Sequence, residues 1–293
     1  MRVFVLGGTG SIGGPLVSCL VRRGHEVIGL ARSSGSADRL RDAGAEPVEG
    51  DISDPGPWVG ALDRADTVIH AADTFGDDMA EIDRRLTSAI LARLSARDTP
   101  AGLICTGGCW NFGDTGGRVI DESAPFDTFD AFGWAVDTIP AVLGAARVTG
   151  MILHPAMVYD GVGGVFEQFA GPARAGDPVP VTESAETYWP LVHAEDLAEL
   201  YALMAEHPQR GLQYHGSVME GVQVGDIAKA VARRFGAPEE LRVVPVEEDV
   251  AALGAWAGGR ALSQRISGER AMRELGWAPN HRDVFADIAA AKI

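Results

Sequence analysis

Three glycines near the start of the chain have the spacing of a diphosphate-binding turn. Gly7, Gly10 and Gly13 follow an apolar run at residues 3–6 and lead into a segment, residues 11–23, that reads as a helix. The first glycine permits a tight turn, the second lets a pyrophosphate approach the backbone, and the third allows close packing of the helix. Free amides at the helix start attract a diphosphate. The pattern predicts a dinucleotide site formed by Gly7, Thr9, Gly10, Ser11, Ile12 and Gly13.

The end of the second apolar run indicates which dinucleotide is bound. Residues 26–31 form this run, and Arg32 follows where an acidic residue would hold the ribose 2′-hydroxyl of NAD. No carboxylate is present there to repel a 2′-phosphate, and a guanidinium can pair with one. The sequence therefore favours NADP(H). The alternative is that Arg32 is a solvated loop residue.

Strand and helix patterns alternate with short connections along the chain. This alternation predicts an α/β fold, a Rossmann-like doubly wound parallel sheet with a smaller C-terminal substrate lobe. Further strands are expected at residues 45–50, 67–72, 102–106 and 151–159, and helices at 134–149, 194–206, 224–235 and 268–275. Glycines and prolines break the pattern from Gly161 to Pro180. We expect a dinucleotide-binding domain at 1–160, with 188–223 returning to it, and a substrate lobe at 161–187 and 224–293.

Composition narrows the classes of partner. The 293 residues carry a formal net charge of −16, which argues against nucleic acid and anionic membranes as partners. The cysteines Cys19, Cys105 and Cys109 lack metal spacing, which indicates reduced thiols and a cytoplasmic location. The histidines show no paired metal spacing either, so we expect no metal. No apolar run is long enough to span a bilayer, and the first strand leaves no room for a signal peptide.

Further motifs follow the expected strands. Asp51-Ile52 follows the third strand, His70-Ala71-Ala72 ends the fourth, and His154-Pro155 lies in the sixth. With the glycine turn and the segments 190–198 and 274–279, they resemble the extended short-chain dehydrogenase/reductases of the NAD-dependent epimerase/dehydratase type. The resemblance implies that Asp51 and Ile52 bracket the adenine, that Ala71 and Ala72 line the inner ribose, and that Pro155 lies beside the nicotinamide. We add Thr106 to this cofactor set. A homodimer through residues 79–97 and 134–149 is the family-like expectation.

The chain departs from the family where the family does its chemistry. Members use a Tyr-x-x-x-Lys pair, and none of the four tyrosines here has a lysine four residues later. The resemblance places Gly107 or Gly108 at the family's serine position, Ala131 or Phe132 at the tyrosine, and Ala135 or Val136 at the lysine. The tyrosine normally exchanges the substrate proton, and the lysine lowers its pKa. Phenylalanine and alanine can do neither.

Three functions remain open. The first is an NADP(H)-dependent oxidoreductase acting on a small organic molecule with another proton donor; the second is a non-redox lyase, isomerase or cyclase; the third is a non-catalytic NADP-binding sensor. The candidate proton donors are Tyr159, Asp137, Cys109 and Thr106, with Tyr188 or a water as further sources. The candidate substrate-pocket residues are Trp110, Phe112, Trp134, His154, Tyr159, Phe166 and Trp189. Each of these residues has a structural role as its alternative.

Overall fold

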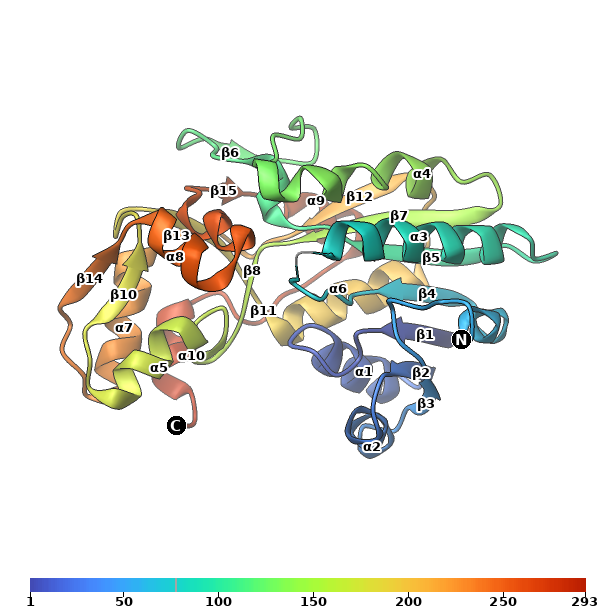
Figure 1. Cartoon of the computed structure of the whole chain (residues 1–293), viewed down its shortest axis with the longest axis horizontal. Helices are drawn as coiled ribbons and strands as arrows, with labels where there is room; N and C mark the ends of the chain where they lie inside the picture. Colours follow the sequence, from blue (N-terminus) through green and yellow to red (C-terminus); the bar gives the residue numbers. More distant parts are fainter. Residues whose placement is uncertain (77) are drawn as a thin grey trace. The chain divides into compact units, whose positions relative to one another are not determined.

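Seven strands form one parallel sheet in the first of two units of the chain. The strands are β1 (Arg2–Leu6), β2 (Glu26–Ala31), β3 (Glu46–Glu49), β4 (Thr67–His70), β5 (Ala101–Thr106), β7 (Val148–Pro155) and β12 (Leu212–Gly216). They lie in the order β12-β7-β5-β4-β1-β2-β3 (Figure 1). The pairings from β3 through β7 are parallel. Because β1 lies inside the sheet with later strands on both sides, the predicted doubly wound fold is confirmed.

Helices flank this sheet (Figure 1). They are α1 (Gly13–Arg22), α2 (Ser34–Asp42), α3 (Met79–Ser95), α4 (Ile139–Gly144) and α6 (Ala194–Glu206), with the 3-10 helix η1 (Val59–Arg64). Apolar side chains from the strands and helices, among them Phe4, Leu86 and Ile152, are fully or almost fully buried in one core. The central strands read as unbroken apolar runs because both of their faces are covered.

The second unit contains smaller sheets. One has the order β13-β11-β8-β9, and two others pair β10 with β14 and β15 with β6. The strands are β6 (Val119–Ile120), β8 (Met157–Asp160), β9 (Gly163–Gly164), β10 (Val179–Thr182), β11 (Tyr188–His193), β13 (Met219–Gln223), β14 (Leu241–Val244) and β15 (Arg265–Ile266). The helices are α5 (Glu167–Ala175), α7 (Val224–Phe235), α8 (Val246–Leu253), α9 (Glu269–Leu275) and α10 (Val284–Ala290), with the 3-10 helices η2 (Cys109–Phe112) and η4 (Ala255–Ala261).

Two of the predicted elements are each divided in the structure. Residues 134–149 do not form one helix: the 3-10 helix η3 (Asp130–Val136) is followed by the short helix α4, and β7 begins at Val148. Pro140 explains the break, because it has no N–H to donate and is accommodated in the first turn of α4. The run at 151–159 is two strands, β7 and β8, interrupted at Ala156. The N–H of Ala156 leaves the ladder and donates to the carbonyl of Gly216 at 2.9 Å.

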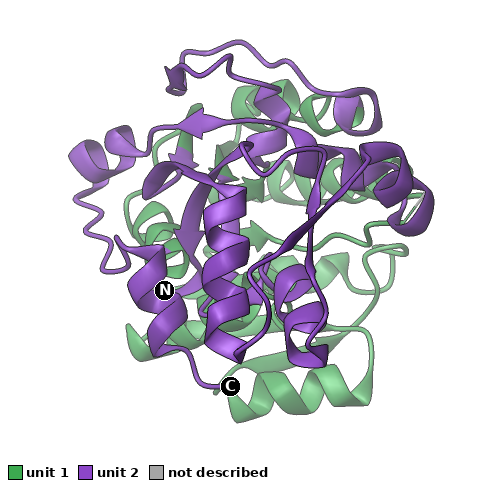
Figure 2. Cartoon of the chain, turned by 90° about the vertical axis from the view of Figure 1, so that its left-hand side faces the viewer, with its two compact units in different colours: residues 1–107, 134–154, 197–214 green, residues 108–133, 155–196, 215–293 purple. Residues whose placement is uncertain are grey.

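The coordinates are a computed structural model, which describes residues 1–76 and 78–293. Figure 2 colours the two units: the first holds 1–107, 134–154 and 197–214, and the second holds 108–133, 155–196 and 215–293. The expected domain boundary at residue 160 falls inside the second unit. That one unit binds the cofactor and the other the substrate stays a prediction. Among the described residues, no helix combines the length and apolar character that crossing a bilayer requires.

Candidate functional site

The glycine turn between β1 and α1 is closed tightly by its own backbone. Gly7 has φ +82°, a left-handed conformation that favours glycine, and a Cβ there would lie 2.4 Å from the carbonyl oxygen of Ala71. A Cβ on Gly13 would lie 2.0 Å from the carbonyl oxygen of Gly7. The N–H of Gly10 donates to that same oxygen at 3.0 Å. Close approach of backbone to backbone therefore requires glycine at the first and third positions.

The predicted cofactor residues of the first unit gather at one edge of its sheet. Because the strands are parallel, Gly7, Arg32, Asp51, Ala71 and Thr106 all lie at or just beyond the carboxyl ends of β1 to β5. The N–H of Ala71 donates to the carbonyl of Leu6 at 3.1 Å, which fixes the end of β4 beside the turn. Open α/β sheets bind ligands outside the carboxyl ends of their strands. Pro155, the last residue of β7, belongs to the second unit.

An unpartnered cation lies at the end of β2. Arg32 is exposed and makes no hydrogen bond or ion pair with any other residue in 1–76 and 78–293. Its neighbour Ser33 caps α2, its hydroxyl accepting from the N–H of Ser36 at 3.2 Å. Hydrogen bonds from Ser53 hold the pKa of the Asp51 carboxyl below its usual range, and the positive charge of Arg32 adds to this effect. An exposed guanidinium beside a capped helix start suits a phosphate.

The hydroxyl group of Thr106 already takes part in two hydrogen bonds. Its Oγ1 donates to the carbonyl of His70 at 2.7 Å, so the contact of 2.6 Å with Tyr201 has the tyrosine O–H as donor. Tyr201, on α6, is fully buried, and burial raises the pKa of its phenol. The sequence alone gives no sign of this contact, because the two residues are 95 positions apart. Thr106 therefore has no spare proton for a substrate in this arrangement.

The other candidate proton donors differ in their exposure. Cys109 is buried, and burial raises the pKa of its thiol to about 12. Tyr159 is fully buried and donates its O–H to Asp287 Oδ2 at 2.6 Å; burial and this hydrogen bond raise the phenol pKa. Asp137 is exposed, and its carboxylate has no hydrogen-bond partner in the part of the chain that the structure describes. Of these three, only Asp137 is open to solvent.

Phe132, one of the two residues expected at the family's tyrosine position, belongs to an aromatic cluster. Its ring meets Trp110 edge-on at 5.5 Å between centroids and lies 5.3 Å from Phe129. Trp110 also stacks on Trp256 at 6.4 Å. The four rings are partly exposed, and we call them the aromatic cluster. A phenyl ring cannot exchange a proton, so this cluster can offer shape and stacking but no acid or base.

The other predicted pocket residues are mostly buried. Tyr159, Phe166 and Trp189 lie in the core of the second unit, where Tyr159 stacks on Phe166 at 5.0 Å. Phe112 is buried there as well. His154 is buried, and its Nε2 lies 3.2 Å from Gln213 Oε1. Trp134 is partly exposed. This burial favours the core role for the first four side chains, while Trp110 and Trp134 remain partly accessible.

A family model of the NAD dependent epimerase/dehydratase family matches residues 3–219. The chain belongs to that family. An uncharacterized protein of Schizosaccharomyces pombe is 28% identical over 296 residues, covering 99% of both chains. A 3-diazoavenalumate denitrifying reductase of a Streptomyces species is 28% identical over 303 residues, covering 96% of this chain and 97% of the relative. The human epimerase family protein SDR39U1 (isoform 2), solved with NADPH, has a TM-score of 0.78 at 19% identity, covering 99% of this chain and 98% of the other.

In one cluster of two histidines and a glutamate, the possible ligand atoms lie close enough together to hold a metal ion. His193, Glu195 and His281 offer ligand atoms within 4.8 Å of one another. The N–H of Glu195 donates to His193 Nδ1 at 3.2 Å, so the neutral imidazole carries its proton on Nε2 and has no lone pair left for a metal. The two imidazole rings also stack at 3.6 Å between centroids, and His281 Nδ1 lies 2.9 Å from Asp287 Oδ1. We assign this cluster a structural role at the start of α6.

Proposed function

We propose that the protein is an NADP(H)-dependent oxidoreductase acting on a small organic molecule, with a proton donor other than the family's tyrosine. The observation that carries the proposal is Arg32. It stands at the end of β2, where a carboxylate would select NAD, and it is exposed with no partner among the described residues. An unpaired guanidinium at this position complements the charge of the 2′-phosphate, the group that NADP(H) has and NAD(H) lacks.

The described residues fit such a cofactor. The diphosphate would lie at Gly7, Thr9, Gly10, Ser11, Ile12 and Gly13, where Gly10 and Ser11 are exposed at the start of α1. Arg32 would bind the 2′-phosphate. By family resemblance, Asp51 and Ile52 would bracket the adenine, and Ala71 and Ala72 would line the inner ribose. Pro155 would lie beside the nicotinamide. We also include Thr106 among the cofactor-binding residues. The bound nicotinamide supplies or accepts a hydride.

The relatives support redox chemistry. The Streptomyces relative is named a reductase, and another relative, from Kitasatospora kifunensis, is named a dTDP-6-deoxy-L-talose 4-dehydrogenase (NAD(P)(+)) at 28% identity over 316 residues. Human SDR39U1, which is 27% identical over 307 residues, was solved with NADPH. These names agree with a phosphorylated nicotinamide cofactor and a small substrate for this chain.

The proton comes from solvent, either directly or through Asp137. Thr106 has committed its proton, Cys109 and Tyr159 are buried with raised pKa values, and Phe132 has no proton to give. Replacement of Asp137 separates the two routes. Slowed turnover of Asp137→Asn with unchanged NADPH binding would assign the relay to Asp137, and unchanged turnover would leave water as the donor.

The cofactor is tested by titrating the protein with NADPH and NADH. Arg32→Ala should weaken NADPH about 10- to 100-fold, because a charge-assisted hydrogen bond contributes about 1.5–3 kcal/mol, and should change NADH little. Arg41→Ala is the matched control, since Arg41 on α2 is exposed and pairs with Asp38 at 2.7 Å. If Arg32→Ala weakened both dinucleotides equally, the argument for NADP(H) would fail.

The reaction class is tested with stereospecifically deuterated NADPH and a panel of small aldehydes and ketones. Deuterium in the product supports the oxidoreductase. Product without label and with the cofactor unchanged would favour a lyase, isomerase or cyclase. Tight NADPH binding without turnover of any compound would favour a sensor.

A further inference from the structure

Arg260, in η4 of the second unit, has a largely buried guanidinium that makes no hydrogen bond to any residue the structure describes, although its backbone carbonyl accepts Trp189 Nε1 at 3.0 Å. Its side chain is 16% exposed. The nearest carboxylate oxygen, Asp249 Oδ2, lies 3.9 Å from Arg260 Nη1, which is beyond hydrogen-bond distance. That same oxygen accepts the hydroxyl proton of Thr182. Within the described part of the chain, the guanidinium donors of Arg260 therefore have no acceptor.

The donors of this guanidinium are left to solvent or to a ligand, because none of its nitrogens is among the fully buried polar atoms without a partner. Burial lowers the pKa of Arg260, which shows that the surroundings disfavour its charge, while the carboxylate of Asp249 opposes this effect only from a distance. Two exposed arginines of this unit have closer carboxylates: Arg174 pairs with Glu167, and Arg242 lies 3.5 Å from Glu248. A planar fork of unused donors is the geometry that binds a carboxylate bidentately.

The guanidinium borders the aromatic cluster. Its carbon lies 5.0 Å from the ring centroid of Trp256, which stacks on Trp110. The backbone of η4 lies close against the Trp110 indole, because a Cβ on Gly259 would come within 2.4 Å of that ring. Arg260 and the four partly exposed rings are thus one continuous group of side chains, with a cation at one end and flat apolar surfaces beside it.

We propose that Arg260 binds the carboxylate of a planar aromatic substrate whose ring packs against Trp256 and its neighbours in the aromatic cluster. The inference rests on the proposed function, because the bound molecule is the one that the oxidoreductase would convert. Aromatic walls with a single convergent charged group are typical of sites for such small acids. The simpler role for Arg260, a cation–π contact that only anchors η4, predicts no preference for a charged ligand.

Two isosteric probes test the proposal on the full-length protein. Isothermal titration calorimetry compares 2-naphthoate with its neutral analogue 2-naphthamide, with and without NADPH. The acid should bind at least about tenfold more tightly than the amide, since bidentate charge-assisted pairing adds to the shared stacking. Arg260→Gln should abolish this preference and leave the affinity for the amide unchanged. Trp256→Ala should weaken both probes.

The controls separate recognition from folding. Arg242→Gln removes an exposed arginine of the same unit and should keep the preference for the acid. Thermal unfolding and NADPH titration check that each variant is folded; if Arg260→Gln does not fold, Arg260→Lys replaces it and should reduce the preference, because an ammonium lacks the planar fork. Equal binding of the two probes by the wild type, no binding of either, or a preference that survives both Arg260 variants would overturn the proposal. Loss of NADPH binding or hydride transfer is measured separately and bears on the proposed function alone.

Discussion

Gly13 and Gly14 are neighbours in the first turn of α1 with opposite steric demands. A Cβ on Gly13 would meet the carbonyl oxygen of Gly7 at 2.0 Å, whereas nothing lies within 4 Å of a Cβ on Gly14. Gly13→Ala should therefore destabilise the protein by about 1–3 kcal/mol and weaken NADPH binding, because the turn must open. Gly14→Ala should be neutral or stabilise by up to about 1 kcal/mol through better helix propensity. Urea unfolding and NADPH titration measure both; similar effects of the two substitutions would contradict this account of the turn.

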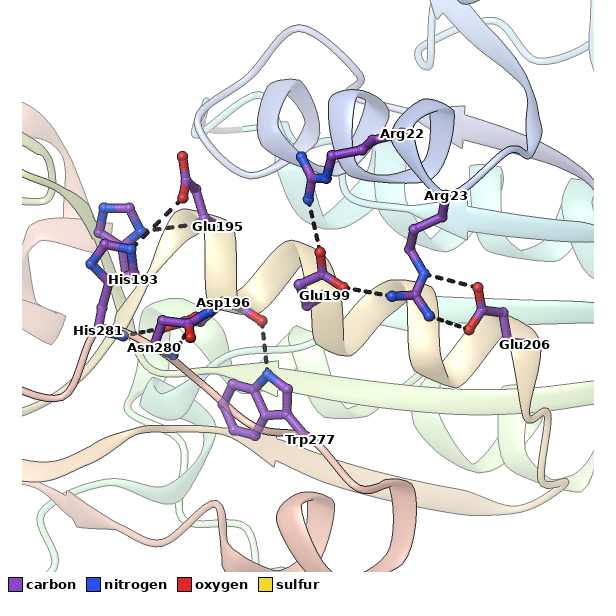
Figure 3. Close-up of polar contacts among 10 residues, drawn as sticks. All are labelled: Arg22, Arg23, His193, Glu195, Asp196, Glu199, Glu206, Trp277, Asn280 and His281. Carbon is purple, nitrogen blue, oxygen red and sulfur yellow. Dashed lines mark hydrogen bonds and ion pairs between the residues drawn. The ribbon is translucent and has the colours of Figure 1, made fainter.

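Asp196 is a buried carboxylate that organises the backbone of the second unit. Its two oxygens accept the N–H groups of Asn280 and His281, each at 2.8 Å, and its carbonyl accepts Trp277 Nε1 at 2.9 Å (Figure 3). Asp196→Ala should cost about 2–4 kcal/mol, because two backbone donors lose a charged acceptor. Glu195→Gln alters the adjacent side chain, which is 75% exposed, and should cost less than about 0.5 kcal/mol. Thermal unfolding compares the two, and an equal loss would show that Asp196 has no special role.

Sequence reasoning works at single residues when the partner is close along the chain. The roles of Gly7 and Gly13 follow from spacing within one turn, and the structure agrees with both. Asp196 and Tyr201 were missed as organising residues, because their partners lie 85 and 95 positions away in the sequence. A lone arginine or tyrosine in a sequence carries no sign of an unmet or a satisfied hydrogen bond. That information exists only once the chain has folded.

At the scale of elements, ion pairs join the end of α1 to α6. Arg23 binds Glu206 with two hydrogen bonds of 2.9 and 2.5 Å, and both Arg22 and Arg23 reach Glu199 at 2.8 Å (Figure 3). His25 Nε2 lies 2.9 Å from Glu206 Oε1, the oxygen that also accepts the Nε–H of Arg23. Because Glu206 is only 22% exposed, this network should contribute more than an isolated surface pair.

Glu206→Gln tests this network through its pH dependence. Hydrogen bonds from Arg23, followed by those from His25, lower the pKa of Glu206 from 4.5 to about 2. A lowered carboxyl pKa stabilises the folded state above pH 4.5, and the stabilisation is lost as pH falls from 4.5 toward 2. The variant should be less stable than wild type by about 1–2 kcal/mol at pH 7, and the difference should shrink toward pH 2.

Denaturant unfolding at several pH values measures this difference. Glu26→Gln is the control, since Glu26 is 71% exposed and pairs with the exposed Arg2; it should cost less than about 1 kcal/mol. A Glu206→Gln deficit that stayed constant down to pH 2 would show that the cost comes from packing and not from the charge.

The sequence predicts best those helices whose apolar residues recur at a regular helical spacing. The helices α6 and α7 have the predicted bounds, and α9 begins one residue later than expected. Residues 134–149 misled the prediction because their apolar residues continue across Pro140 and into β7, so composition alone shows no boundary. The segment around 161–180 contains α5 in spite of its glycines; Gly176 is a left-handed C-cap with φ +79°, a stop signal that was read as irregular chain.

At the scale of the whole molecule, the segments of the two units alternate along the chain, which limits how well their boundaries can be predicted from sequence. The first unit takes its residues from 1–107, 134–154 and 197–214, so no single cut of the chain separates it. Strand β12 and most of α6 join the sheet from late in the sequence, together with Tyr201, Glu199 and Glu206. The predicted return of a later segment to the first domain agrees with residues 197–214, which lie inside the expected range 188–223. Residues 108–133 and 155–160, which we expected in the first domain, belong to the second unit. Composition leaves no mark where the chain passes from one unit to the other.

Global unfolding can be used to detect ligand binding at the proposed cofactor site. A ligand that binds only the folded chain stabilises it by RT ln(1 + [L]/Kd), or about 2.7 kcal/mol at a hundredfold excess over Kd. For a chain of this size that should raise Tm by roughly 5–10 °C with NADPH. NADH at the same concentration should raise Tm less, and in Arg32→Ala the two dinucleotides should give similar, small shifts because the 2′-phosphate has lost its cation. Differential scanning fluorimetry over a cofactor series measures all three, with ATP as a control for nonspecific anion binding. If NADPH left Tm unchanged at every concentration, the carboxyl edge of the sheet would not be a dinucleotide site, however well its glycines are placed.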